Sequence, residues 1–184
     1  PDAIYHLAAI HYIPACTDDP EQARAINVGG TKHVLEAARE CDTAPHVLFT
    51  SSSAVYKNTD EAISEESPIG PIDVYGESKL EAEALVRAYS EETHAPHTIV
   101  RPFNIYGPQD TVPHVIPRII EQLREGDVVK LGNLKPQRDF IFIDDMVDVL
   151  TKMFLEGITG TYNLGTGKAH SIEAVTRLLQ KILK

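Results

Sequence analysis

The chain has 184 residues, of which 42% are hydrophobic and 24% charged, so its composition is that of an ordinary globular protein with enough apolar residues for a core. Its net charge of −10, from 17 basic and 27 acidic residues, argues against a nucleic-acid-binding surface, and no apolar run is long enough to cross a bilayer. The chain opens on Pro1 and a short strand pattern rather than a leader peptide. Cys16 and Cys41 form no CxxC pair and have no histidine at metal-ligand spacing, so we expect free thiols in a reducing cytosol and no metal site.

Strand and helix patterns alternate in the first part of the chain. Short apolar runs predict buried strands at 3–9, 47–51 and 98–101. Asp19 as N-cap and Pro20 as first helical residue begin a helix that runs to about Glu40, and a second helix covers about 75–92. Residues 57–73 are rich in turn formers and predict an irregular connection. This alternation is typical of a doubly wound α/β fold with a parallel sheet covered on both faces.

The pattern changes after Gly107. We expect a helix at 114–125, short strands at "VVKLG" and "RDFIFI", a helix from Asp144, the segment "GTYNLGTG" and a last helix from Ser171. This region resembles a second layer set against the open end of the sheet. Ligands of open parallel sheets bind beyond the carboxyl ends of the strands. The loops at 8–14, 51–56 and 102–108 are therefore the expected site.

Two polar groups on the helix at 75–92 suggest acid–base chemistry. Tyr75 and Lys79 are four residues apart, so both lie on one face of the helix. A phenol titrates near 10, and a nearby ammonium lowers that pKa, which makes a general base for the proton of a sugar hydroxyl. YxxxK alone equally fits a solvated amphipathic helix. The preceding "TSSSAVY" adds a serine cluster at a strand end, which either shares a hydrogen bond with Tyr75 or caps its own loop.

Seven segments in order resemble the extended short-chain dehydrogenase/reductase family, specifically the NAD-dependent nucleotide-sugar epimerases and dehydratases. They are "YHLAA", "NVGGTKHVLEAA", "TSSSAVY", "YGESKLEAE", "RPFNIYGP", "RDFIFIDDMV" and "YNLGTG". The resemblance implies a partial Rossmann-like parallel sheet with a smaller C-terminal substrate-binding region. Residues 1–107 would be the C-terminal part of the NAD-binding Rossmann domain. Residues 108–184 would be mostly substrate-binding, with elements that return to the Rossmann domain, in a cytoplasmic enzyme.

The resemblance also assigns residues that act on the cofactor. Tyr75 would be the catalytic base, Lys79 its partner that also binds the nicotinamide ribose, and Ser52 the catalytic hydroxyl. Asn27 would brace the cofactor-side loop, although a plain polar helix residue is the alternative. The implied NAD-binding residues are Leu7, Ala8, Ala9, His11, Asn27, Thr50, Ser51, Tyr75, Lys79, Pro102 and Phe103.

The implied substrate site consists of Ser53, Asn104 and Arg138. Asn104 would hold the sugar nucleotide, and Arg138 would bind its phosphates, where a guanidinium can bind oxygens bidentately. The alternative for Arg138 is a surface ion pair with Asp139. Dehydratases of the family carry an Asp-Glu pair where this chain has Ser53 and Ala54. The uncharged pair favours a 4-epimerase that works through a 4-keto sugar.

Other functions remain open at this stage. A dehydratase, decarboxylase or reductase of the same family is one alternative, and a non-catalytic dinucleotide-binding protein is another. We expect no nucleic-acid or membrane partner, and the family's helix pairing suggests a homodimer through 23–40 and 75–92. The chain departs from the family in two respects. The glycine-rich loop and the acidic residue that reads the ribose are absent, so the resemblance covers the middle of the family, and Lys57 stands where glycine is usual.

Overall fold

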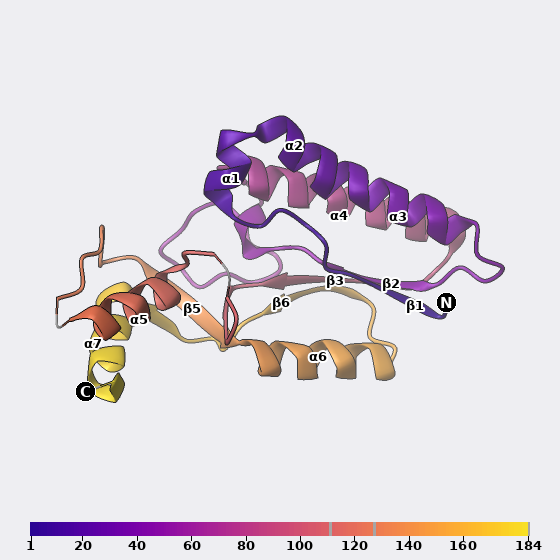
Figure 1. Cartoon of the computed structure of the whole chain (residues 1–184). Coiled ribbons are helices and arrows are strands. Elements are labelled where there is room, and N and C mark those ends of the chain that lie inside the picture. Colours follow the sequence, from indigo (N-terminus) through magenta and orange to yellow (C-terminus); the bar gives the residue numbers. More distant parts are fainter. Residues whose placement is uncertain (111, 127, 184) are drawn as a thin grey trace. The chain divides into compact units, whose positions relative to one another are not determined.

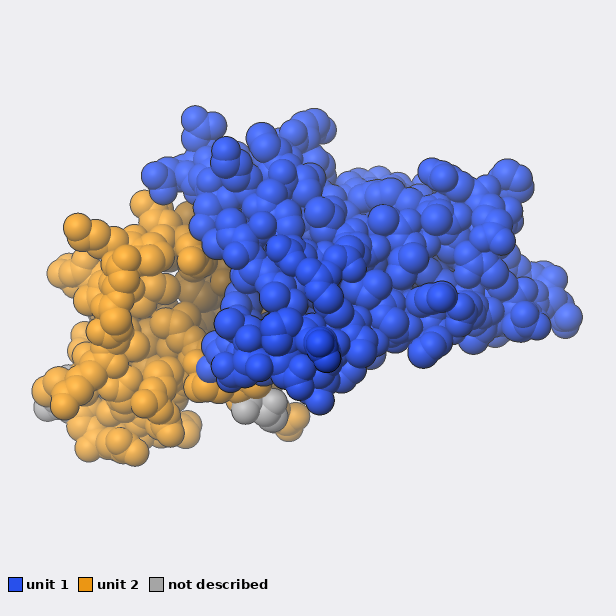
Figure 2. Space-filling view, turned by 90° about the horizontal axis from the view of Figure 1, so that it is seen from above, with its two compact units in different colours: residues 1–102, 151–164 blue, residues 103–150, 165–184 orange. Residues whose placement is uncertain are grey.

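The chain forms two compact units in the computed structural model, which describes residues 1–110, 112–126 and 128–183. The first unit comprises Pro1–Pro102 and Thr151–Leu164, and the second comprises Phe103–Leu150 and Gly165–Lys184 (Figure 2). In the described ranges no helix combines the length and apolar character that a membrane span requires.

The first unit is built on a four-stranded parallel sheet in the order β1-β2-β3-β6. Its strands are β1 (Ala3–His6), β2 (His46–Thr50), β3 (His97–Pro102) and β6 (Gly160–Leu164). The three strands predicted from apolar runs are confirmed as parallel neighbours, and "GTYNL" adds the fourth. Three consecutive residues of β2, Val47–Phe49, are almost fully buried, as expected for a parallel strand covered on both faces.

Strand β1 is shorter than the predicted 3–9. Its parallel pairing with β2 ends at His6 opposite Phe49. Beyond it, the backbone of Ile10 bonds to the Asn27 side chain instead of to a strand: the N–H donates to Oδ1 at 2.7 Å and the C=O accepts from Nδ2 at 3.0 Å. The Asn27 side chain therefore holds the loop that follows the strand.

Two long helices cover one face of this sheet (Figure 1). They are α3 (Gly30–Arg39) and α4 (Val74–Thr93), and they pack against β2 and β3 in a core of Leu35, Ala38, Val47, Phe49, Ala82, Val86, Tyr89, Ala95 and Ile99. The apolar positions of α4 recur at helical spacing, which is why this segment folds as a helix with one buried face. The Asp73 carboxylate caps its start by accepting from the Gly76 N–H at 2.8 Å.

The helix predicted from 20 to 40 is confirmed as an uninterrupted helical segment from Pro20 to Arg39, with a π-helical turn inside it. A short helix α1 (Ile13–Asp18) precedes α2 (Pro20–Arg24), a π-helical turn η1 (Ala25–Gly29) follows, and α3 begins at Gly30. Asp19 caps α2 as predicted, with Oδ1 accepting from Gln22 N at 3.0 Å. Single π-turns within helices are frequent at functional sites, and this one contains Asn27.

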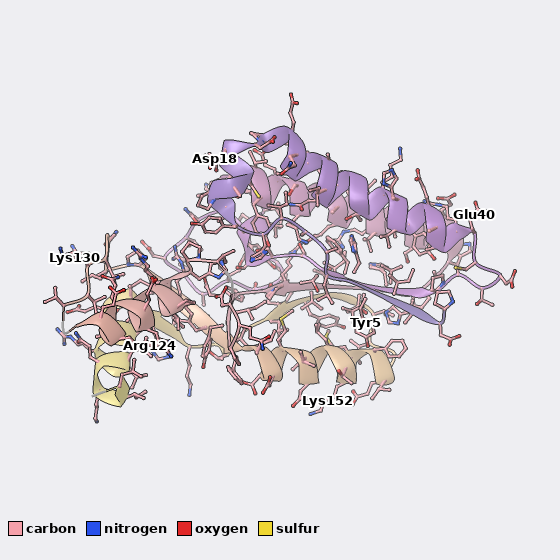
Figure 3. All side chains as sticks on the ribbon, viewed as in Figure 1. Tyr5, Asp18, Glu40, Arg124, Lys130 and Lys152 are labelled. Carbon is pink, nitrogen blue, oxygen red and sulfur yellow. The ribbon has the colours of Figure 1, made fainter. Side chains whose placement is uncertain are left out.

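The opposite face of the sheet is covered in part by the last turn of α6 (Ile143–Leu155), whose residues from Thr151 belong to the first unit. Phe154 meets the ring of Tyr5 edge to face with 5.6 Å between centroids, and Tyr5 is labelled in Figure 3. The His46 ring lies 5.9 Å from the same phenyl group. These contacts place aromatic rings against β1 and β2.

The second unit has its own three-stranded sheet in the order β4-β5-β7. Its strands are β4 (Asn104–Tyr106), β5 (Gln137–Phe142) and β7 (Ala169–Ser171), with β5 parallel to β4 and antiparallel to β7. Helices α5 (Val115–Glu125) and α7 (Ile172–Leu183) lie side by side (Figure 1). The helices predicted from 114, 144 and 171 thus begin within one residue of those positions.

One predicted strand of this unit is wrong. Residues 128–132, "VVKLG", form no strand. The side chain of Gln122 instead binds the backbone of Lys130 on both sides, donating to its C=O at 3.2 Å and accepting from its N–H at 2.7 Å. A helix side chain therefore takes the backbone bonds that a neighbouring strand would otherwise provide.

Candidate active site

The serine cluster forms a tight turn where β2 ends. Ser52 Oγ accepts a hydrogen bond from Ala54 N at 3.1 Å and begins the 3₁₀ turn η2 (Ser53–Val55). The same hydroxyl forms a side-chain hydrogen bond with Tyr75 that lowers the pKa of the phenol. Ser52 therefore caps its own turn, as one interpretation of the serine cluster predicted, and it also acts on the pKa of Tyr75. Its catalytic role stays a prediction.

Close packing at Gly76 brings the turn and α4 together. A Cβ at position 76 would lie 2.4 Å from the carbonyl oxygen of Ala54 and 2.9 Å from Cβ of Pro71. Only glycine allows the first turn of α4 to approach the backbone of η2 this closely. The glycine after Tyr75 in "YGESK" thus sets the position of the phenol relative to Ser52.

The electrostatics of Tyr75 differ from the expectation. Burial raises the pKa of the phenol, the Ser52 hydrogen bond lowers it, and Cys16 and Asp73 raise it further. The net direction is upward, so the predicted lowering by Lys79 is wrong for this structure. Desolvation of the phenolate outweighs the attraction that the spacing suggested.

Lys79 lies one helical turn after Tyr75 and is 3% exposed. Its ammonium lies over the Phe49 ring, 4.4 Å from the centroid, in a cation–π contact. Burial lowers the pKa of Lys79 to about 8, while the Glu83 carboxylate acts in the opposite direction. The ammonium therefore titrates close to the working range of an acid–base catalyst.

Asn27 braces the loop after β1. Its amide holds both backbone groups of Ile10 and donates to Ser78 Oγ at 2.9 Å, and Ser78 in turn donates to the Tyr75 carbonyl at 2.8 Å. Asn27 is 2% exposed, so it is no ordinary surface residue of a helix. The geometry agrees with the loop-bracing position that the resemblance implied.

The other residues assigned to the cofactor in the first unit lie along the ends of its strands. In the loop after β1, Ala9 is half-buried and the remaining residues are exposed: Leu7, Ala8 and His11. Thr50 is the last residue of β2 and Ser51 follows it, and Pro102 is buried at the end of β3. Across the described ranges, Thr50 Oγ1 is the one buried side-chain oxygen or nitrogen without a hydrogen-bond partner.

The connection at 57–73 pairs back onto the end of the Ser52–Tyr56 turn. Tyr56 and Ile69 form an antiparallel bridge, and Lys57 N donates to Pro68 O at 2.9 Å. A Cβ at Gly70 would lie 3.2 Å from Cβ of Lys57. Lys57 is therefore accommodated beside a glycine, which compensates for the missing glycine at 57.

A buried charge pair beneath the site was missed by the sequence interpretation. Arg101 donates two hydrogen bonds to Glu83, at 2.8 and 2.6 Å, and Ser51 donates a third at 2.6 Å. The available signal was a charge at the end of the apolar strand "TIVRP" and an opposite charge on the buried face of α4. Two such charges are stable inside a protein only when they pair.

Asn104 and Arg138, which the resemblance assigned to the substrate, belong to the second unit. Asn104 Nδ2 donates to the Asp139 carbonyl at 3.0 Å, and the exposed Arg138 donates to the Gln137 carbonyl at 2.9 Å. Phe103 also belongs to this unit, whereas Ser53 lies half-buried in η2 of the first unit.

The carboxylate of Asp139 is occupied by the turn after β6. It accepts from Thr166 N at 3.0 Å, Thr166 Oγ1 at 2.6 Å and Gly167 N at 2.8 Å. A Cβ at Gly165 would lie 2.6 Å from Asp139 Oδ2, so the turn approaches the carboxylate closely. The ion-pair interpretation of Arg138 is not supported, because its supposed partner holds backbone and hydroxyl groups instead.

A parallel sheet with a Ser–Tyr–Lys set at the carboxyl ends of its strands defines the chain as an α/β protein of the extended short-chain dehydrogenase/reductase type. Within that class, the chain belongs to the NAD dependent epimerase/dehydratase family, whose model matches residues 1–165.

Individual relatives differ in the reactions that their names describe. The chain is 31% identical over 185 residues to the uncharacterized UDP-glucose epimerase YtcB of Bacillus subtilis, covering 98% of this chain and 58% of that protein. It is also 31% identical over 192 residues to GDP-6-deoxy-D-mannose reductase of Pseudomonas aeruginosa, covering 99% and 63%. The solved structure of UDP-glucuronic acid 4-epimerase from Bacillus cereus, in complex with UDP-glucuronic acid and NAD, matches with a TM-score of 0.89 and 32% identity over 98% of this chain and 59% of that one.

Proposed function

We propose that the protein containing this chain is an NAD-dependent nucleotide-sugar 4-epimerase, similar in reaction to a UDP-glucose/UDP-galactose 4-epimerase. The observation that carries the proposal is the close packing of the Ser52 turn on the first turn of α4 at Gly76, which lets Ser52 act on the Tyr75 phenol, with Lys79 one turn further along α4. This chain spans 58% of the first relative and 63% of the second, so the activity is proposed for the whole protein.

The residues at the strand ends fit a dinucleotide. The Thr50 hydroxyl is buried without a partner, and the Lys79 ammonium lies buried beside the same strand, over Phe49. An unpartnered buried hydroxyl costs free energy unless a ligand completes it. NAD would be held here by Lys79, Thr50 and the loop that Asn27 braces. When bound, the nicotinamide supplies a reversible acceptor for the hydride of the sugar carbon.

Tyr75, assisted by Ser52, transfers the proton of the sugar 4-hydroxyl in this mechanism. Because the pKa of Tyr75 is raised, the phenol is protonated at rest and needs a partner to act as a base. The Ser52 hydrogen bond favours the phenolate. Lys79 lies one turn further along the same helix. Tyr75 takes the proton of the 4-hydroxyl as the 4-keto sugar forms and returns it after the sugar has turned over.

The turn itself favours epimerisation over dehydration. Elimination of water needs an acid and a base next to the catalytic hydroxyl, and positions 53 and 54 are Ser and Ala. The backbone of Ala54 is occupied, because its N–H bonds Ser52 and its C=O packs on Gly76. No side chain of this pair is able to remove a proton from carbon.

Substrate binding would fall to Ser53, Asn104 and Arg138. Arg138 is exposed in its unit, and its guanidinium would bind the diphosphate of the sugar nucleotide. The division at residue 107, into a cofactor-binding part and a mostly substrate-binding part, belongs to this proposal.

Product analysis tests the proposal. Full-length protein with NAD is incubated with UDP-, dTDP- and GDP-hexoses, and the products are identified by NMR. We expect the C4 epimer of one sugar with no net change in NAD. A 4-keto-6-deoxy product would assign a dehydratase, net oxidation of NAD(P)H would assign a reductase, and cofactor binding without any turnover would assign a non-catalytic binding protein.

A further inference from the structure

A charged pair lies buried under the catalytic turn. Glu83 on α4 is 1% exposed and Arg101 on β3 is 4% exposed. Arg101 Nε and Nη2 donate to the two carboxylate oxygens at 2.8 and 2.6 Å. Bidentate pairing explains how both charges are accommodated. It does not explain why two charged residues occupy these positions, because a protein is often at least as stable when apolar residues replace a buried ion pair.

The same carboxylate reaches the end of β2. Ser51 Oγ donates to Glu83 Oε1 at 2.6 Å, and Ser51 is joined directly to Ser52. Arg87, one turn further along α4, donates to Oε2 at 2.7 Å. Glu83 therefore ties the residue before the catalytic serine to the helix that carries the catalytic tyrosine.

Glu83 is also the counter-charge of Lys79. The two residues are one turn apart, so they lie on the same face of α4. The other titratable group facing Lys79 is His6 at the end of β1, whose pKa is lowered by burial and then by Lys79. Arg101 pairs with Glu83, and Tyr75 lies one turn before Lys79 on α4. Glu83 is therefore the anion that favours the charged form of the Lys79 ammonium.

The guanidinium is fixed from its far side. Arg101 Nη1 donates to the Tyr56 hydroxyl at 2.8 Å, and that hydroxyl donates to Asn163 Oδ1 at 2.8 Å. The Tyr56 ring also lies under the guanidinium at 4.8 Å. Arg101 thus cannot turn away, and the orientation of Glu83 follows from it.

We propose that Glu83 is a positioning residue of the catalytic centre: its carboxylate, fixed by Arg101, holds the Ser51–Ser52 turn and the Lys79 turn of α4 in their working arrangement. The inference rests on the proposed function, because it gives the pair a purpose in proton transfer. Glu83 touches no substrate in this assignment and acts through Ser51 and Lys79.

The test uses full-length protein with Glu83→Gln and the control Glu92→Gln. Glu92 lies on the same helix and pairs at the surface with Arg39. A misplacement of about 1 Å can cost about 10²-fold in rate. We expect Glu83→Gln to lower kcat by about tenfold to a hundredfold with KM nearly unchanged. We also expect the alkaline limb of the pH–rate profile to move to lower pH, because Lys79 loses its counter-charge. Glu92→Gln should change neither.

A second variant separates position from charge. Glu83→Asp keeps the anion but withdraws it by one methylene, so kcat should fall while the alkaline limb stays in place. Tyr56→Phe removes the outer link and should lower thermal stability without moving that limb. Unchanged kcat in folded Glu83→Asp, or equal pH profiles for Glu83→Gln and Glu92→Gln, would overturn the proposal.

A readout without turnover separates this inference from the proposed reaction. The ammonium of Lys79 can be titrated by NMR in wild type and in both Glu83 variants. The Lys79 pKa should fall in Glu83→Gln and stay close to wild type in Glu83→Asp. If wild type converts no nucleotide sugar, the proposed function fails, and this titration still decides whether Glu83 supports Lys79. Equal titration curves for all three proteins would contradict the inference.

Discussion

The carbonyl oxygen of Ala54 lies where a side chain at Gly76 would begin, 2.4 Å from an added Cβ. Because the obstacle is backbone rather than a flexible side chain, any residue other than glycine must push α4 away from the catalytic turn. The distance between Ser52 and the Tyr75 phenol depends on that packing.

Gly76→Ala should therefore damage both stability and activity. Overpacking of this kind costs about 1–3 kcal/mol, and the displaced phenol should lower turnover well beyond the fraction of protein that unfolds. Urea denaturation and steady-state kinetics on the same preparation measure the two effects. Gly30→Ala is the control, since nothing lies within 4 Å of its added Cβ. That change should stabilise the helix by about 0.5–1 kcal/mol. A Gly76→Ala protein with normal kinetics would show that the close approach is not needed.

Arg138→Ala should mainly weaken binding of the nucleotide sugar. The guanidinium is exposed and Asp139 is engaged with Thr166 and Gly167, so the arginine has no ion pair to lose among the residues that the structure describes. A charge-assisted hydrogen bond contributes about 1.5–3 kcal/mol, which predicts a loss of about ten- to a hundredfold in affinity. Calorimetric titration with UDP-sugar measures it, with NAD affinity expected to stay constant.

The matched control for Arg138 is Arg177→Ala, an exposed arginine of the same unit that pairs with Glu173. It should bind the sugar nucleotide as wild type does. If Arg138→Ala lowered only the melting temperature, Arg138 would be a structural residue of β5 after all.

The sheet could be predicted because its strands are short, uninterrupted apolar runs. Val47–Phe49 must be buried on both faces, and only a covered parallel sheet offers that. The loop after β1 could not be predicted in detail, because its backbone bonds at Ile10 go to the side chain of Asn27, 17 residues further along the chain. The strand wrongly predicted at 128–132 fails for a similar reason, because the side chain of Gln122 bonds the backbone N–H and C=O of Lys130.

For the candidate site, the placement of Ser52 at a strand end and of Tyr75 and Lys79 on one helix could be predicted, the electrostatics could not, and the roles of these residues stay predictions. The spacing of Ser52, Tyr75 and Lys79 follows from a strand end and a helical turn, which sequence patterns report well. The direction of the Tyr75 pKa depends on how much solvent the fold removes, and spacing carries no information on that. The homodimer through α3 and α4 stays a prediction.

Buried neutral histidines should make stability depend on pH. His46 Nε2 bonds Thr98 Oγ1 at 2.8 Å, and because that hydroxyl gives its proton to the Ile158 carbonyl, the histidine must be the donor. Burial lowers the pKa of His46 in the folded protein. In the unfolded chain the same imidazole is protonated near pH 6.5, so between these two pKa values only the unfolded chain binds the proton. The stabilising contribution is complete above about pH 6.5 and is lost as the pH falls below it.

Urea midpoints between pH 7.5 and 5 measure this dependence. Each proton that the unfolded chain binds and the folded protein does not changes the free energy of unfolding by at most about 1.4 kcal/mol per pH unit. His46→Gln keeps a donor for Thr98 but cannot titrate, so the slope should flatten. His33→Gln, on the exposed face of α3, is the control and should leave the slope unchanged. A slope equal in His46→Gln and wild type would mean that other groups cause the acid loss.

Tyr75→Phe should abolish turnover while the fold and the bound cofactor survive. The ring keeps its packing, but the proton of the sugar hydroxyl has no acceptor. General acid–base catalysis contributes about 10²–10⁴-fold, and the loss should reach the top of that range because proton removal accompanies hydride transfer. Tyr89→Phe is the control: it makes the same change near the other end of the same helix, where the hydroxyl bonds the Pro45 carbonyl at 3.5 Å and interacts with Thr93. Near-normal turnover of Tyr75→Phe would end the enzymatic interpretation.

Ser52→Ala should shift the rising limb of the pH–rate profile to higher pH. The Ser52 hydrogen bond is what lowers the pKa of Tyr75 against the effect of burial, so its removal raises that pKa further. The rising limb of the pH–rate profile should therefore shift to higher pH, and activity lost at neutral pH should return in part as the pH increases. Ser90→Ala, which removes a bond to the Ala95 carbonyl near the other end of α4, should leave the limb in place. If Ser52→Ala lowered activity equally at every pH, Ser52 would act only as the cap of its own turn, and the acid–base coupling between Ser52 and Tyr75 would be wrong.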